Sequence, residues 1–287
     1  MVICESCGKE MSTWKLDEKN QLSLCKFCKH VQRSLKEAPA DCREHAWGGV
    51  GLFDHIRTWF TWRSQQKYLK KKKQPSDNVL ELGFGAGLML KRHIALGHKC
   101  TGVEADLLEI GLPEYLKGKI NFHASSAENM NLPPNSFNLV YAIHVAEHLL
   151  EPQKVFGLIY NTLVPGGVLQ FLTPNGSSAG LSIFRSHWWN LEDPTHIRFY
   201  SPESIKYMLE KAGFTDVEVR FPRWDSLTLE GASFARCFLH HSGKHGVMSK
   251  KTGKLLALFS APFFAFVRLF WGRLNPSMEI YARKPTA

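Results

Sequence analysis

Four cysteines near the start of the chain are spaced as two pairs that could bind one metal ion. Cys4 and Cys7 form one Cys-x-x-Cys pair, and Cys25 and Cys28 form the second after a 17-residue spacer. Each pair can present two thiolates from a tight turn, and four thiolates complete a closed tetrahedral zinc shell with no open position for catalysis. We therefore expect structural zinc in a zinc-ribbon-like module over residues 1–30, because so short a segment has little other means of folding.

Three glycines could bring the backbone close to a ligand. Gly83, Gly85 and Gly87 alternate directly after a buried strand signal at Val79–Leu82. Glycine allows a ligand to approach where a side chain would collide. The G-x-G-x-G spacing differs from the G-x-G-x-x-G that seats a pyrophosphate, so it does not favour a dinucleotide. Glu104 ends the next strand and offers a carboxylate that can accept both hydrogen bonds of a ribose diol.

Two histidines are candidates for proton transfer. His196 lies in a segment of aromatic residues interspersed with His, Glu and Arg, which suits a partly apolar pocket with a few polar groups. His144, Glu147 and His148 follow the fourth strand with the i, i+3, i+4 spacing of one helical face at the carboxyl edge of the sheet. If an acceptor hydroxyl must lose a proton, histidine is the simplest general base, so His196 is the first candidate and His144 the second. A loop-tethering role for His196 is an equal alternative.

Alternating strand and helix signals must position these residues. The expected strands are Val79–Leu82, Lys99–Val103, Ile120–His123, Phe137–Ile143, Val168–Leu172, Val217–Phe221 and Met278–Arg283. The expected helices are Leu88–Leu96, Leu107–Leu116, Pro152–Leu163 and one that begins after the N-cap Ser201. This alternation predicts an α/β fold, with a Rossmann-like, doubly wound sheet of seven strands covered by helices on both faces.

The same signals predict how the chain is divided. We expect the zinc-ribbon-like module at 1–30, a helical arm or linker at 31–75, and the α/β domain at 76–287. Two segments within that domain, 176–200 and a largely helical 222–276, are too long to be simple connections. We expect both insertions to contact the substrate, because functional residues concentrate on such segments.

The ordered motifs resemble those of class I S-adenosylmethionine-dependent methyltransferases of the ubiquinone and menaquinone type. They are Glu81-x-Gly83-x-Gly85-x-Gly87, Glu104, Ser125–Pro133 followed by Ser136–Val140, and Leu163–Gly167. The resemblance covers residues 78–222 and implies methyl transfer from S-adenosylmethionine. It implies that the three glycines line the methionine end of this cofactor, that Glu104 holds the ribose, that Ala127 and Glu128 flank the adenine, and that Glu81 also belongs to the cofactor-binding residues. Trp47 resembles the aromatic-glycine arm that folds over the cofactor, and a plain linker with a core tryptophan is the alternative.

The histidine group extends the resemblance. Some ubiquinone-type O-methyltransferases bind a divalent cation through Glu-x-x-Glu-His, and here His144 replaces the first glutamate before Glu147 and His148. The replacement removes an oxygen ligand, so a softer metal would fit better than a hard one. The alternative is that these side chains line the pocket and cap neighbouring backbone.

Charge and hydropathy suggest where partners bind. The net charge of +10 divides into +7 for residues 1–75, −4 for 76–220 and +7 for 221–287, so a polyanionic partner would meet the two ends. The first residues carry no secretory signal, which predicts a cytoplasmic protein. Within residues 250–271, an apolar run of 13 residues before Arg268 is too short to span a bilayer. It would lie peripherally at the inner membrane face, or else cover the sheet or an acceptor tunnel.

Together these features predict an enzyme that methylates an oxygen of a small-molecule, glycan or lipid-linked acceptor. One alternative is an rRNA or tRNA methyltransferase that grips RNA with the zinc module and Lys70–Lys73. Nucleic acid is the weaker prediction, because no aromatic residues are interleaved with that basic run. The other alternative is a non-catalytic binding module that keeps the fold.

Overall fold

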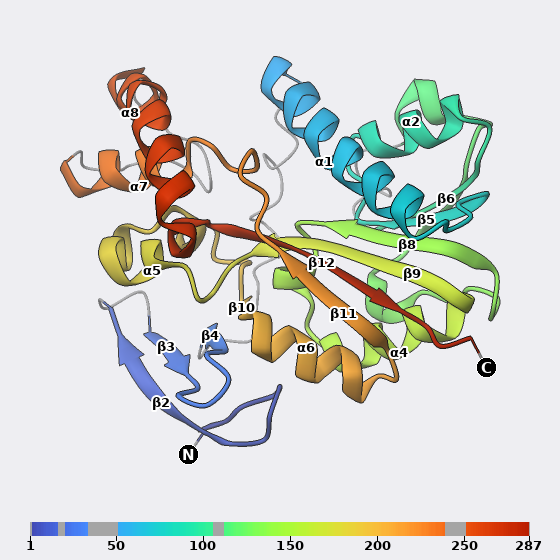
Figure 1. Ribbon diagram of the computed structural model, residues 1–287, viewed down its shortest axis with the longest axis horizontal. Helices are drawn as coiled ribbons and strands as arrows, with labels where there is room; N and C mark the ends of the chain where they lie inside the picture. The colour runs from blue at the N-terminus through green and yellow to red at the C-terminus, as the bar shows by residue number, and fades with distance from the viewer. Residues whose placement is uncertain (1, 17–20, 34–50, 106–111, 239–250, 287) are drawn as a thin grey trace. The chain divides into compact units, whose positions relative to one another are not determined.

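The computed structural model describes residues 2–16, 21–33, 51–105, 112–238 and 251–286, and these residues form two compact units (Figure 1). The first, which we call the cysteine unit, contains the described residues up to Arg33 together with Thr173–Tyr207 and Arg220–Met278. The second, which we call the sheet unit, contains the described residues from Gly51 to Leu172, Met208–Val219 and the residues from Glu279 onwards.

The sheet unit is built on seven strands in the order β11-β12-β9-β8-β5-β6-β7. Their bounds are β5 (Asn78–Leu82), β6 (Lys99–Glu104), β7 (Asn121–Ala124), β8 (Phe137–Ile143), β9 (Leu163–Pro174), β11 (Thr215–Arg220) and β12 (Ser277–Arg283). Neighbouring strands from β9 to β7 are parallel, with Leu80 of β5 opposite both Thr101 of β6 and Val140 of β8. The seven-stranded Rossmann-like sheet is therefore confirmed. β9 begins earlier than expected, because Leu163 already pairs with Phe137.

Helices α1 (Leu52–Lys71), α2 (Leu88–Ala95), α4 (Pro152–Thr162) and α6 (Pro202–Lys211) accompany these strands, as expected. Half of the helix expected at Leu107–Leu116 lies outside the described part of the chain, because residues 106–111 are not described, and the described remainder contains a 3-10 turn, η2 (Glu114–Leu116). Gly51 precedes α1 and donates its backbone N–H to the Asp54 carboxylate at 3.0 Å, which satisfies one end group of the helix.

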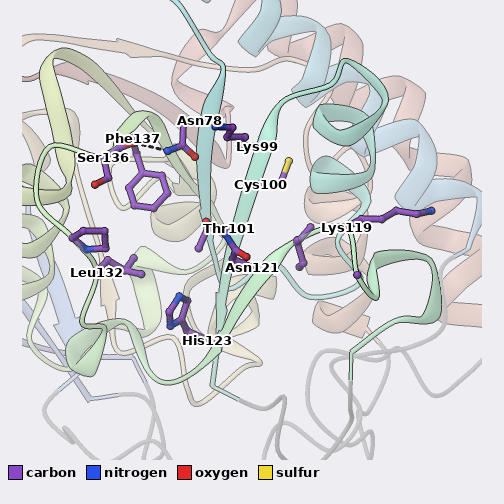
Figure 2. Close-up of a pocket in the computed structure, with 13 residues that line it drawn as sticks. Asn78, Lys99, Cys100, Thr101, Lys119, Asn121, His123, Leu132, Ser136 and Phe137 are labelled. Carbon is purple, nitrogen blue, oxygen red and sulfur yellow. Dashed lines mark hydrogen bonds between the residues drawn. The ribbon is translucent and has the colours of Figure 1, made fainter.

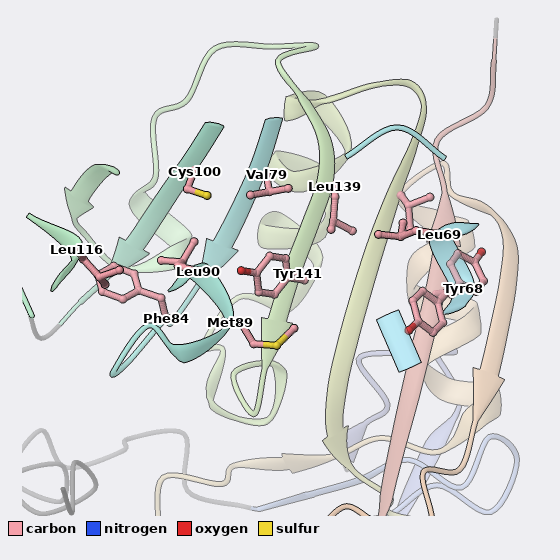
Figure 3. Close-up of a cluster of buried hydrophobic side chains, with 12 residues drawn as sticks. Tyr68, Leu69, Val79, Phe84, Met89, Leu90, Cys100, Leu116, Leu139 and Tyr141 are labelled. Carbon is pink, nitrogen blue, oxygen red and sulfur yellow. The ribbon is translucent and has the colours of Figure 1, made fainter. Parts of the chain in front are cut away.

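The core of the sheet unit lies where α1 and α2 pack on the strands (Figure 3). Leu90 of α2 and Val79 of β5 are fully buried. Tyr68 of α1 stacks on Tyr281 of β12 with 3.8 Å between ring centroids. Each such large apolar side chain contributes about 1.5–3 kcal/mol by leaving water. This packing holds the strand ends, and therefore the loops that follow them, in fixed positions.

The cysteine unit contains a second, five-stranded sheet in the order β1-β2-β3-β4-β10. Its strands are β1 (Val2–Ile3), β2 (Glu10–Lys15), β3 (Gln21–Leu24), β4 (Val31–Arg33) and β10 (Arg198–Phe199), all paired antiparallel. The unit also contains α5 (Ala179–Phe184), α7 (Leu229–Phe238) and α8 (Lys251–Phe270). The insertion at 176–200 thus contributes a strand that pairs directly with the segment following the second cysteine pair.

Candidate functional site

The glycine loop after β5 requires glycine at its ends. Gly83, Gly85 and Gly87 have φ of +61°, +56° and +65°, a region that disfavours residues with a side chain. A Cβ atom on Gly83 would lie 2.4 Å from Cγ2 of Val145, and one on Gly87 would lie 2.4 Å from Cδ1 of Leu116. Only glycine fits both the positive φ and the close neighbours at Gly83 and Gly87, and its presence there allows the chain to form a tight loop.

Glu104 is held against this loop. One of its carboxylate oxygens accepts a hydrogen bond from the Gly85 backbone N–H at 3.0 Å, and the other accepts one from the Ala105 N–H at 3.0 Å. Two backbone donors orient the carboxylate at the carboxyl end of β6, beside the end of β5. Parallel α/β sheets bind nucleosides at this edge. The glycine loop and an oriented carboxylate therefore fit the nucleoside and amino-acid ends of S-adenosylmethionine.

Glu81 lies within β5 and is fully buried, which raises the pKa of its carboxyl well above the usual value. The Tyr141 hydroxyl donates a hydrogen bond to this carboxyl at 3.0 Å, which acts in the opposite direction. The Tyr115 hydroxyl donates to the backbone carbonyl of Ala86 in the glycine loop. Tyr115 thus contacts the glycine loop itself and Tyr141 contacts the strand before it, and no sequence motif had singled out either residue.

Ala127 and Glu128 lie in a 3-10 turn, η3 (Ala127–Asn129), which follows β7. The Glu128 carboxylate accepts a hydrogen bond from the Leu150 N–H at 2.8 Å, which ties this turn to the segment after β8. The preceding Ser125 N–H donates to the Glu104 carbonyl at 3.1 Å. The turn that carries Ala127 and Glu128 is thereby tied to the end of β6 at Glu104 and to the segment after β8. Trp47 lies outside the described residues.

A cavity of about 510 Å³ lies at the opposite edge of the same sheet (Figure 2). Asn78, Lys99, Asn121 and Phe137 line it, and each stands at the start of a strand. The glycine loop follows the other end of β5. This cavity is therefore separate from the candidate cofactor site.

The segment after β8 differs from the helical turn expected for the histidine group. His144 has φ of +54° and precedes a 3-10 turn, η4 (Ala146–His148), so His144, Glu147 and His148 do not share the face of an α-helix. The His144 Nδ1 lies 3.2 Å from the buried Glu147 carboxylate. In the part of the chain that the structure describes, His144 joins no group of three metal-binding side chains, so the expected cation site at His144, Glu147 and His148 is not formed as such. The positive φ at His144 is the physical reason.

His196 belongs to the cysteine unit, whereas His144 belongs to the sheet unit. The His196 Nδ1 lies 2.8 Å from the Asn190 backbone carbonyl, which can only accept, so Nδ1 donates this hydrogen bond. Nε2 lies 3.8 Å from the Asp193 carboxylate. The Arg33 side chain donates to the backbone carbonyls of His196 and Leu191 at 2.9 and 2.7 Å. The loop that carries His196 is thus held from β4.

The four N-terminal cysteines converge as their spacing predicts. The Sγ atoms of Cys4 and Cys28 are 3.5 Å apart, as are those of Cys7 and Cys25, and all four lie within 4.8 Å of one another. Zinc at about 2.3 Å from each sulfur requires sulfur pairs about 3.8 Å apart. In both pairs, the residue four positions after the first cysteine donates its N–H to that cysteine's carbonyl at 2.9 Å. The geometry fits a tetrahedral metal site.

A hydrogen-bonded group beside these cysteines was missed by the sequence analysis. The fully buried His30 contacts the Glu5 carboxylate through Nε2 at 3.0 Å and the Ser204 hydroxyl through Nδ1 at 3.3 Å. Arg198 of β10 donates to both Glu5 oxygens at 2.6 and 3.0 Å. Burial alone would raise the pKa of Glu5, but the bonds from His30 and Arg198 lower it to about 2. No local pattern could have revealed this group, because its members come from both ends of the unit.

Comparison with known proteins agrees with this geometry. A family model described as a methyltransferase domain matches residues 53–219, more than half of the chain. A ubiquinone biosynthesis O-methyltransferase of Dinoroseobacter shibae is 28% identical over 153 residues, which cover 49% of this chain and 60% of that protein. One from a Bradyrhizobium species is 29% identical over 144 residues, covering 46% and 56%. The matches thus span only about three fifths of these relatives.

Solved structures share the fold at low identity. Phosphoethanolamine N-methyltransferase 2 of Haemonchus contortus, in complex with S-adenosyl-L-methionine, aligns with a TM-score of 0.55 at 17% identity, over 96% of this chain and 71% of that one. An S-adenosylmethionine-dependent methyltransferase from Archaeoglobus fulgidus aligns with a TM-score of 0.50 at 22% identity, over 82% and 100%. Because the family model covers more than half of the chain and agrees with the glycine loop and Glu104, the chain belongs to the methyltransferase-domain family.

Proposed function

We propose that the protein methylates a hydroxyl oxygen of a small-molecule or lipid-linked acceptor, including glycan carriers. The observation that carries the proposal is the likeness to curated relatives named as ubiquinone biosynthesis O-methyltransferases, which are 28% and 29% identical to this chain. A hydroxyl must lose its proton as its oxygen is methylated, and histidine is a residue suited to accept it. His196, whose Nδ1 lies 2.8 Å from the Asn190 carbonyl, is the candidate that the sequence offers for this role.

In the proposed reaction, bound S-adenosylmethionine supplies an electrophilic methyl group. Gly83, Gly85 and Gly87 let the backbone approach its methionine end, and Glu104 accepts hydrogen bonds from its ribose, as Ala127 and Glu128 flank its adenine. His196 is the proposed acceptor of the hydroxyl proton. Positioning of the acceptor by the surrounding residues supplies much of the remaining rate, since orientation alone can contribute about 7–11 kcal/mol.

We propose further that the four cysteines bind structural zinc. The sulfur spacing supports this, because two pairs at 3.5 Å are close to the edges of a zinc–thiolate tetrahedron. Burial raises the pKa of the Cys4 thiol to about 11. Zinc would displace such a proton on binding, since the metal binds the thiolate form. The closed shell leaves zinc a structural role.

The reaction can be tested without knowing the acceptor. Purified protein is incubated with S-adenosylmethionine carrying a labelled methyl group and, separately, with the lipid, glycan and RNA fractions of the producing cell. We expect label in the lipid or glycan fraction, and mass spectrometry should find a product heavier by one CH2. Label in the RNA fraction alone would replace the proposal with an RNA methyltransferase, and cofactor binding without any transfer would favour a binding module.

His196→Ala tests the proton acceptor. We expect kcat to fall about a hundredfold to ten-thousandfold, the usual contribution of a general base, while the cofactor Kd stays unchanged. His187→Ala is the matched control, because His187 is an exposed histidine of the same unit. Full turnover by His196→Ala at normal cofactor affinity would remove His196 from the mechanism and leave it a tethering role.

A further inference from the structure

Helix α8 carries a stripe of large apolar side chains that the structure leaves exposed. Phe259, Phe263, Phe266 and Phe270 are 77%, 63%, 59% and 78% exposed. The other members are Leu255, Leu258 and Leu269, which are 51%, 48% and 51% exposed. At 100° per residue, these seven positions fall within an arc of about 140° on the helix. We call them the α8 stripe. Scattered apolar residues are normal on a protein surface, but a continuous stripe of this kind indicates a binding surface.

The opposite face of α8 is fixed on α7 (Figure 1). Ala257 and Ala261 are buried, and a Cβ atom on Gly231 of α7 would lie 2.5 Å from the Ala257 carbonyl oxygen, so the two helices approach closely. Phe264 packs on Phe184 of α5 with 6.2 Å between ring centroids. These contacts fix the orientation of α8 about its own axis, so the α8 stripe faces away from the side that packs on α7.

A buried ion pair strengthens this orientation. Arg268 of α8 pairs with Glu230 of α7, and both side chains are 1% exposed. The Arg268 guanidinium also donates to the backbone carbonyls of Asp225 and Ser226 at 3.1 and 2.8 Å. Rotating the stripe inward would break a buried pair, which is strongly unfavourable. The exposed state of the stripe is therefore a stable feature of the cysteine unit.

The sequence that carries the stripe has basic residues and no acidic ones. Between Gly231 and Met278 it has no Asp or Glu and seven basic residues, which are Arg236, Lys244, Lys250, Lys251, Lys254, Arg268 and Arg273. Arg236 and Arg268 form ion pairs with glutamates outside this stretch, and Lys244 and Lys250 lie outside the described residues. Lys251 and Lys254 belong to the first turn of α8 and Arg273 to the 3-10 turn that follows it, η7 (Gly272–Leu274), so the α8 segment carries a net positive charge. An apolar stripe with basic residues nearby in the sequence complements a surface that has an apolar interior under an anionic outer layer.

We propose that the α8 stripe docks the protein on the surface of a bilayer that contains anionic lipid. Phenylalanine and leucine side chains would enter the headgroup boundary, and the basic residues would meet the lipid phosphates. The described helices include none that is long and apolar enough to cross a membrane, so α8 would lie in the plane of the surface. This proposal does not depend on which acceptor is methylated.

The charge argues for lipid over a second copy of the chain. Pairing two α8 stripes would bring two acid-free, basic regions together, and like charges at close range oppose association. A bilayer with anionic headgroups instead attracts each basic residue by about 1 kcal/mol at the surface.

Vesicle co-sedimentation with the full chain tests the proposal. Wild-type protein is mixed with vesicles of phosphatidylcholine alone and of phosphatidylcholine with 30% phosphatidylglycerol. We expect binding to the anionic vesicles that weakens at high salt, and at least a tenfold weaker partition for Phe259→Ser/Phe270→Ser. Leu96→Ser/Phe122→Ser is the control, because it removes two side chains that are 56% and 51% exposed elsewhere on the surface. We expect this control to bind as wild type does.

Two further measurements make the outcome decisive. Calorimetry with S-adenosylmethionine must give the same Kd for both double variants, so that loss of vesicle binding reports the surface and not the fold. Light scattering measures the mass of the wild-type protein without lipid. No binding to either vesicle, equal binding by Phe259→Ser/Phe270→Ser, or a wild-type dimer that this variant dissociates would each overturn the proposal. The last result would assign the stripe to a second copy.

Discussion

In the sheet unit, the Glu104 carboxylate is held by backbone N–H groups within 19 positions of it, whereas the cysteine unit has side-chain bonds between residues far apart in the sequence. The Gly85 N–H to Glu104 bond joins residues 19 positions apart. In the cysteine unit the Ser6 hydroxyl donates to the Ser204 carbonyl, 198 positions away, and Arg198 pairs with Glu5 across 193 positions. The cofactor site therefore depends on local backbone shape, and the cysteine unit depends on long-range contacts and on any metal it binds.

This difference predicts that loss of the metal site will damage one unit and spare the other. We expect Cys28→Ser to abolish zinc binding and to lower the free energy of unfolding of the cysteine unit by about 4 kcal/mol, a part of the roughly 10–16 kcal/mol that a four-ligand zinc site supplies. The cofactor Kd should change less than twofold, because Cys28 does not belong to the sheet unit. Elemental analysis, thermal unfolding and calorimetry measure the three quantities.

Cys237→Ser is the matched control, since Cys237 is an exposed cysteine of the same unit and lies outside the metal group. It should retain one zinc per chain and wild-type unfolding. If Cys28→Ser bound the cofactor tenfold more weakly while the sheet unit stayed folded, the contrast between the two units would be wrong.

In the sheet unit, the cofactor site should depend on the Glu104 carboxylate. Glu104→Gln should weaken cofactor affinity by about 1.5–3 kcal/mol, or roughly tenfold to 150-fold, because hydrogen bonds to a charged carboxylate are lost. The zinc content should not change. Isothermal calorimetry measures the affinity, and Glu114→Gln is the control, because the Glu114 side chain is 86% exposed in the same unit. Equal affinities for wild type and Glu104→Gln would show that this carboxylate does not bind the ribose.

Features marked by residue type and short spacing could be predicted from the sequence, and those that join distant segments could not. The glycine loop and Glu104 are marked by residue type and short spacing, and the seven strands by apolar runs, so both could be inferred before the structure. The converging cysteines follow from their pair spacing. The bonds of His30 and Arg33 could not be inferred, because they depend on chain segments brought together only by folding. The helical turn expected at His144 was wrong, because His144 has a positive φ, which interrupts a helix. A histidine in the sequence does not by itself indicate a positive φ.

The smallest predicted effect is an acid sensitivity of the sheet unit that begins at α2. His93 is fully buried beneath Trp62 and beside Tyr141, and its Nδ1 lies 2.9 Å from Nδ1 of His98. One ring must donate and the other accept at this distance, so the two rings cannot both be protonated. Burial, with His98 as a smaller cause, lowers the pKa of His93 from 6.5 to about 3.

The sign of the effect follows from the two states. Below pH 6.5 the unfolded chain binds a proton at His93 that the folded chain excludes, so stability is present above pH 6.5 and is lost as the pH falls toward 3. Each pH unit costs about 1.4 kcal/mol, which amounts to about 2 kcal/mol between pH 6.5 and 5. Urea unfolding of wild type and His93→Gln at pH 7 and pH 5 measures it, with the exposed His123→Gln as control. His93→Gln should lose this part of the pH dependence and His123→Gln should keep it, because only the buried ring must shed a proton to fold. An unchanged slope in His93→Gln would mean that the acid sensitivity of the sheet unit begins at another group.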